Sequence, residues 1–105
     1  MDNFKIIYRI LKILEKSMQI EEFDKSTLSA EALGLEVPHW ARIMTLLCNE
    51  GYVTGVHTAT YLSSTYPQVT LIQPEITLKG LEYLSENSFM KKAADVAKGV
   101  INIVT

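Results

Sequence analysis

The chain has 105 residues, of which 48% are hydrophobic and 21% are charged, and its formal net charge at pH 7 is −2. These values predict one ordinary globular domain with a modest core, and they exclude a strongly basic nucleic-acid binder. Cys48 is the only cysteine, so no internal disulfide can form. The first apolar run, from Ile6 to Leu14, is too short and too charged to span a membrane. We therefore expect a cytoplasmic protein.

The N-terminal segment has the periodicity of an amphipathic helix. Asp2 is a suitable cap for a helix from about Asn3 to Ser17, because its carboxylate can accept from a free N–H in the first turn. The apolar residues of one face are Phe4, Ile7, Ile10, Leu11 and Leu14. The polar segment from Gln19 to Lys25 predicts a loop, and Ser26 to Leu28 are expected to form a short strand beside a later hairpin.

The next segment is predicted to fold as a helix-turn-helix. Ser29 is a suitable cap for a short helix that ends at Gly34, a residue that favours the left-handed conformation of a helix stop. Pro38 then occupies the first position of a longer helix, where its missing N–H would have had no intrahelical partner. That third helix runs to about Glu50, and its inward face comprises Trp40, Ile43, Met44 and Leu47.

A hairpin and two further helices are predicted after the third helix. Tyr52 to His57 and Val69 to Ile72 have the composition of paired strands, with a long tip from Thr58 to Gln68. Pro74 is expected to end the pairing, because it has no N–H to donate. The two remaining helices, capped by Thr77 and Ser88, are Leu78 to about Glu86 and Phe89 to about Val104.

This order of elements predicts an α+β fold of the winged helix-turn-helix type, with a three-helix core, a two-stranded β-wing and two C-terminal helices. ITLKGLEYL, Ile76 to Leu84, is similar to the helix after the wing in many bacterial winged-helix proteins. NEGYVTGV, Asn49 to Val56, is similar to the junction between their recognition helix and wing. Over roughly residues 3–90 the chain resembles the YjcQ family of small bacterial and prophage winged-helix proteins. The predicted single domain, 1–105, has its core at about 3–87 and a C-terminal helix at about 88–104.

The third helix is the candidate surface for reading DNA bases, since domains of this fold most often bind duplex DNA. Wheel geometry turns Arg42, Thr45 and Asn49 outward, with His39 beside them. The donors of Arg42 match guanine, and the amide of Asn49 matches adenine. The first functional hypothesis is a DNA-binding transcriptional regulator of bacterial or phage origin. An ordinary solvated helix face is the alternative interpretation.

Cations for the DNA phosphates are predicted mainly on the first helix. Four basic residues follow spacings of four, three and four and therefore line one face: Lys5, Arg9, Lys12 and Lys16. Lys79 on the fourth helix is a further candidate. The stripe is interpreted as a contact for phosphates or an acidic partner, or as a plain solvated face.

The predicted wing tip, from His57 to Gln68, contains neither Lys nor Arg. Thr60 and Ser63 are candidates to donate hydroxyl hydrogen bonds to phosphates. The apolar residues Tyr61, Leu62 and Tyr66 suit a protein contact instead, unless they fold back on the domain. The alternative function is therefore a protein-interaction module that keeps the winged-helix shape without binding DNA.

The last predicted helix, Phe89 to Val104, is apolar over a wide arc. This pattern favours either a homodimer through that helix or its burial against the first helix. A small-molecule pocket between the first and fifth helices is a third hypothesis. The few lysines of the last helix do not make the strongly basic face of a membrane-surface helix, so no membrane partner is expected.

Enzymatic chemistry is not predicted. His39, His57 and Cys48 lack the spacing of metal ligands, and Cys48 is expected to be a small buried hydrophobe. The sequence has no glycine-rich phosphate loop. We therefore expect no catalytic residues, no cofactor and no metal.

Overall fold

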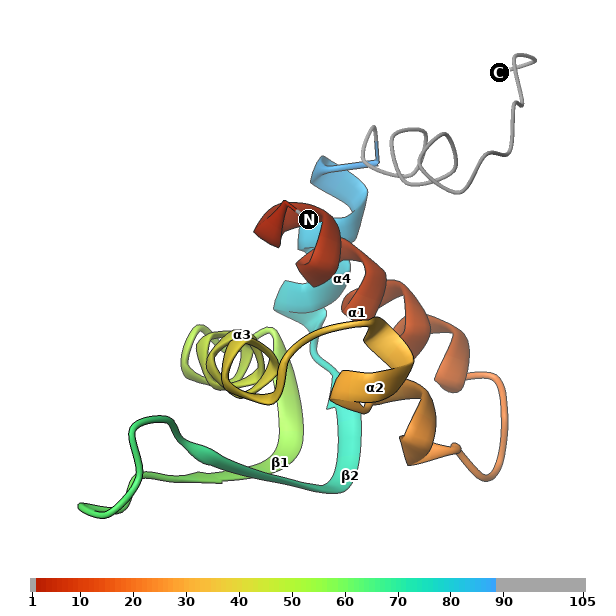
Figure 1. Ribbon diagram of the computed structural model, residues 1–105. Coiled ribbons are helices and arrows are strands. Elements are labelled where there is room, and N and C mark those ends of the chain that lie inside the picture. The colour runs from red at the N-terminus through yellow and green to blue at the C-terminus, as the bar shows by residue number, and fades with distance from the viewer. Residues whose placement is uncertain (1, 89–105) are drawn as a thin grey trace.

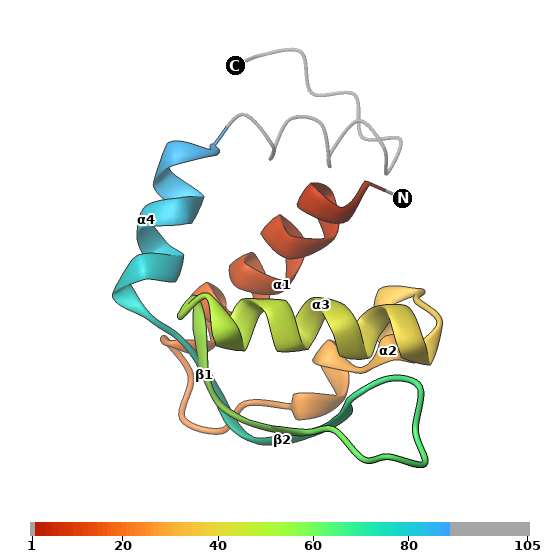
Figure 2. The same ribbon diagram turned by 90° about the vertical axis from the view of Figure 1, so that its left-hand side faces the viewer.

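Helices and one antiparallel hairpin build an α+β fold in the computed structural model, which describes residues 2–88. The elements, in chain order, are α1 (Asn3–Ser17), η1 (Lys25–Leu28), α2 (Ala30–Leu33), α3 (Val37–Asn49), β1 (Val53–Ala59), β2 (Gln68–Ile76) and α4 (Leu78–Glu86). Figure 1 shows the helices packed together above the hairpin. Figure 2 shows α3 crossing in front of α1, with the hairpin running beneath α3.

Side-chain caps begin three helices at the residues that the sequence predicts. Each cap accepts from a backbone N–H in the first turn of its helix: Asp2 from Phe4 at 2.8 Å, Ser29 from Ala32 at 3.1 Å and Thr77 from Gly80 at 3.1 Å. Gly34 ends α2 in the left-handed conformation, with φ 71°. The helix α3 begins at Val37, one residue before the predicted Pro38. These local bonds satisfy N–H groups that no helix can satisfy internally.

The core lies where α1 meets α3, the hairpin and α4. From α1 it takes Ile6, Tyr8, Ile10, Leu11 and Leu14, and from α3 Ile43, Met44 and Leu47. Trp40 is only half-buried, and its indole N–H donates to the Leu28 carbonyl at 2.7 Å. Each fully buried aliphatic side chain stabilises the fold by about 1.5–3 kcal/mol. This core anchors α3, whose other face is exposed to solvent.

The strand predicted at Ser26–Leu28 is wrong, because Lys25–Leu28 form the 3-10 helix η1. The Asp24 carboxylate accepts from the Ser26 N–H at 3.0 Å and from its hydroxyl at 2.6 Å. These two bonds lower the pKa of Asp24 and hold the chain in a turn that competes with extended pairing. Among the described residues the sheet consequently has two strands, and the outer edge of β2 has no strand partner.

The prediction that Pro74 ends the hairpin is wrong, because β2 continues to Ile76. The register pairs Thr54 with Glu75 and Val56 with Leu71, so the three residues 72–74 face Gly55 alone. The ladder between β1 and β2 is already interrupted at this bulge. The missing N–H of Pro74 therefore removes no hydrogen bond of the regular ladder. The antiparallel pairing itself is confirmed.

Candidate nucleic-acid interface

The solvent-facing side of α3 carries the side chains predicted to read DNA. Arg42 and Asn49 are exposed, while Thr45 is half-buried. Leu46, on the same side, is 55% exposed. The helical spacing predicted this arrangement, since Ile43, Met44 and Leu47 occupy the opposite, buried face. The face is therefore a narrow polar strip with an apolar residue in it.

Arg42 joins this strip to the tip of the hairpin. One terminal nitrogen of its guanidinium donates to the Thr65 carbonyl at 3.0 Å. Figure 2 shows the loop between β1 and β2 curving back beside the N-terminal half of α3. A guanidinium has five N–H donors, so this single bond leaves most of them available. Sequence reasoning did not reveal the contact, because the loop conformation sets it.

The two other predicted base-reading residues make contacts within the protein. The Thr45 hydroxyl donates back to the Ala41 carbonyl at 2.8 Å. A ring nitrogen of His39 lies 2.7 Å from the Asn3 side-chain oxygen, which links α3 to the start of α1. The Thr45 hydroxyl can still accept, and the second ring nitrogen of His39 takes no part in its contact. Arg42 and Asn49 are nevertheless the more accessible polar groups, because they are exposed while Thr45 and His39 are half-buried.

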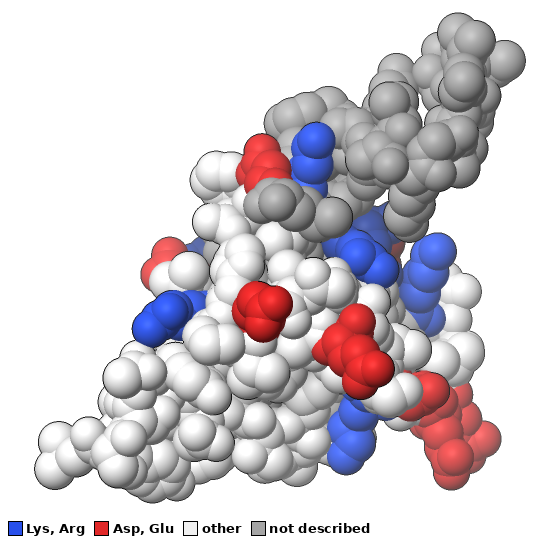
Figure 3. Space-filling view, viewed as in Figure 1, with Lys and Arg blue, Asp and Glu red and all other residues white. Residues whose placement is uncertain are grey.

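The hairpin tip, residues 60–67, is uncharged and exposes apolar side chains. Tyr61 is 54% exposed and Leu62 is 109% exposed, so these two do not fold back on the domain. Tyr66 is half-buried, and its carbonyl accepts from the Ser64 hydroxyl at 2.6 Å. Thr60 and Ser63 are exposed. In Figure 3 the protruding tip itself is white throughout. The cation that contacts it, Arg42, belongs to α3.

The basic stripe on α1 is not a row of four equivalent cations. Lys12 forms a 2.8 Å ion pair with Glu15, and this hydrogen bond raises the pKa of Lys12. Arg9 points toward α2, with its terminal nitrogens 3.5 Å from the carbonyls of Ala32 and Leu33. Those carbonyls lie at the C-terminal end of α2, where a cation is favourable. Lys5 and Lys16 complete the stripe.

Lys79 has a structural role that the sequence analysis did not predict. Its ammonium donates to the Glu50 carbonyl at the end of α3, at 2.8 Å, and lies 5.1 Å from the centre of the Tyr52 ring. Tyr52 in turn packs edge to face on Tyr83. A cation at a helix C-terminus and over an aromatic face is stabilised by both. Lys79 therefore clamps α4 to the end of α3.

Metal sites and membrane-spanning helices are both absent from the described residues 2–88. They contain no group of His, Cys, Asp and Glu arranged to hold a metal ion. None of their helices has the length and apolar character needed to cross a bilayer.

Comparison with known proteins identifies the family. A family model described as YjcQ protein matches residues 8–103. The chain belongs to the YjcQ family. It is 33% identical over 101 residues to the uncharacterized protein YjcQ of Bacillus subtilis (strain 168), with 95% of each chain covered. The predicted family is thus confirmed.

A solved YjcQ structure supports the arrangement of the elements. The solution NMR structure of the Bacillus subtilis YjcQ protein is 30% identical to this chain, with a TM-score of 0.51. The likeness covers 79% of this chain and 92% of that one. The predicted homodimer helix of this YjcQ-family chain, Phe89 to Val104, lies outside the described residues.

Proposed function

We propose that this YjcQ-family protein is a winged-helix, DNA-binding regulator that inserts α3 into the major groove. The carrying observation is the exposed strip on α3 beside the hairpin, joined to it by the bond between Arg42 and Thr65. The order of α2, α3 and the hairpin matches the docking geometry in which a second helix reads bases while a wing lies alongside.

Arg42 is the residue proposed to read sequence. Its guanidinium is exposed, and its fork of donors fits the two major-groove acceptors of guanine. The bond to Thr65 orients the side chain along the helix surface in the free protein. Asn49, at the far end of α3, is proposed to contact an adenine or a phosphate.

The proposal is tested by replacing Arg42 and measuring binding to fluorescent duplex DNA at low salt. Arg42→Ala should lower the affinity for the selected DNA sequence by roughly 5- to 150-fold, since a bidentate base contact is worth about 1–3 kcal/mol. Binding to unrelated duplexes should change less. Selection from a random-sequence duplex pool supplies the preferred site.

Lys25→Ala is the matched control, because it removes the same charge on the other side of the hairpin from α3. It should leave DNA affinity nearly unchanged. If both variants lost the same DNA affinity, the effect of Arg42 would be explained by its charge alone and not by a base contact. Absence of duplex binding by the wild-type chain at low salt would end the proposal.

A second candidate function rests on the wing tip. Leu62 is 109% exposed and Tyr61 is 54% exposed, on a loop without a charged side chain. Phosphate neutralisation supplies most non-specific DNA affinity, and such a tip offers none. Exposed aromatic and aliphatic anchors are characteristic of protein contacts. In this alternative the module binds a protein through the hairpin tip.

The second candidate is tested by affinity purification with the double variant Tyr61→Ser and Leu62→Ser, from a lysate of the cells that naturally express the protein. Any specific partner should be lost, whereas Leu78→Ser should retain it. Leu78 is 74% exposed on α4, so this control removes an exposed leucine away from the tip. Retention of the partner by the double variant would exclude the tip as its contact.

A further inference from the structure

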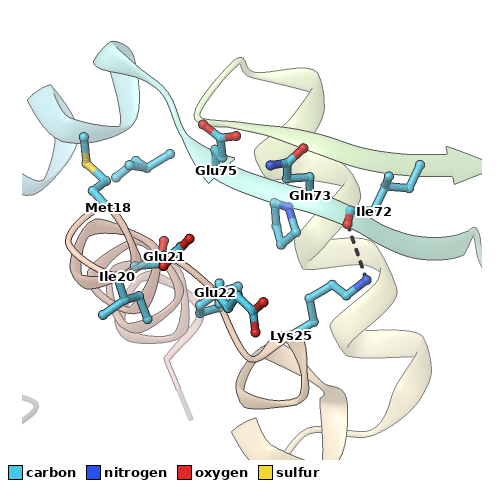
Figure 4. A pocket seen from close by; sticks show the side chains of 12 residues that line it. Met18, Ile20, Glu21, Glu22, Lys25, Ile72, Gln73 and Glu75 are labelled. Atoms are coloured by element: carbon cyan, nitrogen blue, oxygen red, sulfur yellow. Dashed lines mark hydrogen bonds between the residues drawn. The ribbon is translucent and has the colours of Figure 1, made fainter.

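A groove runs along β2 on the side of the hairpin away from α3. It has a volume of about 540 Å³ and lies between residues 72–76 of β2 and the segment from Ser17 to Lys25. Figure 4 shows the lining side chains arriving from these two segments. Figures 1 and 2 place the segment after α1 and the helix α3 on opposite sides of the hairpin. The groove is therefore separate from the proposed DNA surface.

The backbone of β2 is open toward this groove. No described strand pairs with the outer edge of β2, because residues 25–28 form η1. The Ile72 carbonyl points outward, since it accepts from the Lys25 ammonium at 3.4 Å, across the groove in Figure 4. This bond is long and exposed, so another donor can replace it. A lysine over an edge strand is a common device against unwanted pairing.

The side chains of the groove combine apolar and acidic character. Met18 is 63% exposed, Ile20 is 55% exposed and Ile72 is 62% exposed, and all three line it. The charged lining residues are Glu21, Glu22, Glu75 and Lys25, which sum to a formal charge of −2. Figure 3 shows acidic side chains gathered at the lower right, the position of the segment after α1 in Figure 1.

We propose that this groove binds an extended peptide of a partner protein, with alternating basic and apolar residues. A backbone N–H of the peptide replaces Lys25 at the Ile72 carbonyl. This is a single backbone contact and not a continuous ladder, because the bulge at residues 72–74 and the missing N–H of Pro74 interrupt the edge of β2. Its basic side chains face Glu21, Glu22 and Glu75, and its apolar side chains cover Met18, Ile20 and Ile72. The charge of the groove selects a basic occupant over an acidic one.

The test uses the full chain and a fluorescein-labelled decapeptide of alternating Lys and Val, followed by anisotropy at low salt. A decapeptide of alternating Glu and Val serves as the matched probe. The basic peptide should bind and the acidic one should not. Equal binding of both peptides, or of neither, would overturn the proposal.

Two pairs of charge variants locate the contact. Glu22→Gln with Glu75→Gln should lower the affinity for the basic peptide by roughly 2- to 25-fold, since exposed ion pairs contribute about 0.2–1 kcal/mol each. Glu82→Gln with Glu86→Gln makes the same charge change on α4 and should leave affinity unchanged. Lys25→Ala should strengthen binding, because it frees the Ile72 carbonyl and removes the competing cation. Equal effects of the two pairs would contradict the site.

Backbone contact is tested by NMR, because a purely electrostatic encounter would not perturb one strand edge. The amide signals near Ile72 and Gln73 should shift on addition of the basic peptide, and those of α3 should not. Shifts confined to α3 or the tip would overturn the assignment. Sedimentation of the chain without peptide tests whether a second copy occupies the groove. If the chain is a dimer and Glu22→Gln with Glu75→Gln dissociates it, the groove binds a second copy and not a partner peptide.

Discussion

Gly55 is the residue on which the hairpin geometry depends most directly. Its φ is +76°, and a Cβ at this position would lie 1.8 Å from the Gln73 carbonyl oxygen. Gly55→Ala should therefore combine left-handed strain with a backbone clash and lower the free energy of unfolding by about 3 kcal/mol. Urea unfolding, with midpoint and slope both fitted, measures the loss.

Gly34 supplies the matched control for that substitution. Its φ is +71°, yet a Cβ there would meet nothing within 4 Å. Gly34→Ala should cost only the strain, about 1 kcal/mol. If the two variants lost the same stability, the close approach of β1 and β2 at the bulge would not be the cause.

Cys48 gives a pH-dependent prediction at the same scale. Partial burial raises the pKa of its thiol, because a low-dielectric surrounding disfavours the thiolate. The folded chain should then react with iodoacetamide more slowly than an unfolded chain, and the rate should rise at higher pH than for a free thiol. By linkage, the thiol stabilises the fold below its ordinary pKa, and this contribution falls as pH rises above it.

The single cysteine makes this measurement unambiguous, since alkylation of any other thiol is excluded. Mass spectrometry of the alkylated chain gives the rate at each pH, and urea provides the unfolded reference. Identical rates in the folded and unfolded chain would contradict burial of the thiol.

At the scale of elements, Thr77 connects helix α4 to the end of α3. Its hydroxyl oxygen accepts from the Gly80 N–H at 3.1 Å, and its hydroxyl donates to the Gly51 carbonyl. Thr77→Ala loses both bonds and should lower stability by about 1–2 kcal/mol. Thr77→Ser should restore most of that loss in chemical denaturation. Thr70→Ala, at an exposed position in β2, should change stability by less than about 0.5 kcal/mol.

The elements that the sequence predicts well are those controlled by local chemistry. The caps Asp2, Ser29 and Thr77 and the stop at Gly34 act within one helical turn, so their residue types identify them. The strand expected at Ser26–Leu28 fails because the Asp24 side chain forms local bonds that the composition does not reveal. The missing N–H of Pro74 predicts the end of the strand pairing, but the bulge opposite Gly55 removes the need for that donor.

The candidate sites were less predictable, because side-chain partners depend on tertiary contacts. Helical spacing correctly turned Arg42 and Asn49 outward. It did not indicate that Arg42 contacts Thr65, that Lys79 contacts Glu50, or that Lys12 pairs with Glu15 on its own helix. The groove along β2 was not predicted either, because it depends on how the segment from Ser17 to Lys25 lies against β2.

Across the described residues 2–88, charge is distributed unevenly, and the cations do not gather on the face formed by α3 and the hairpin tip. The hairpin tip has no charged side chain, the groove along β2 is acidic, and the formal net charge is −2. On the face drawn in Figure 3, Lys and Arg side chains lie at the left, at the lower centre and, several together, at the upper right. A rigid duplex therefore meets only some of these cations at once, and Lys12 already forms an ion pair with Glu15.

This distribution predicts a shallow salt dependence of DNA binding. Each phosphate contact contributes about 0.9 to the slope of log affinity against log salt concentration, so two or three contacts should give a slope of about −2 to −3. Lys16→Ala should reduce the magnitude by about 0.9 if the α1 stripe contacts the backbone, whereas Lys25→Ala should leave it unchanged. Anisotropy at several salt concentrations measures the slope. A slope near zero would rule out phosphate contacts and favour the hairpin tip as a protein-binding surface.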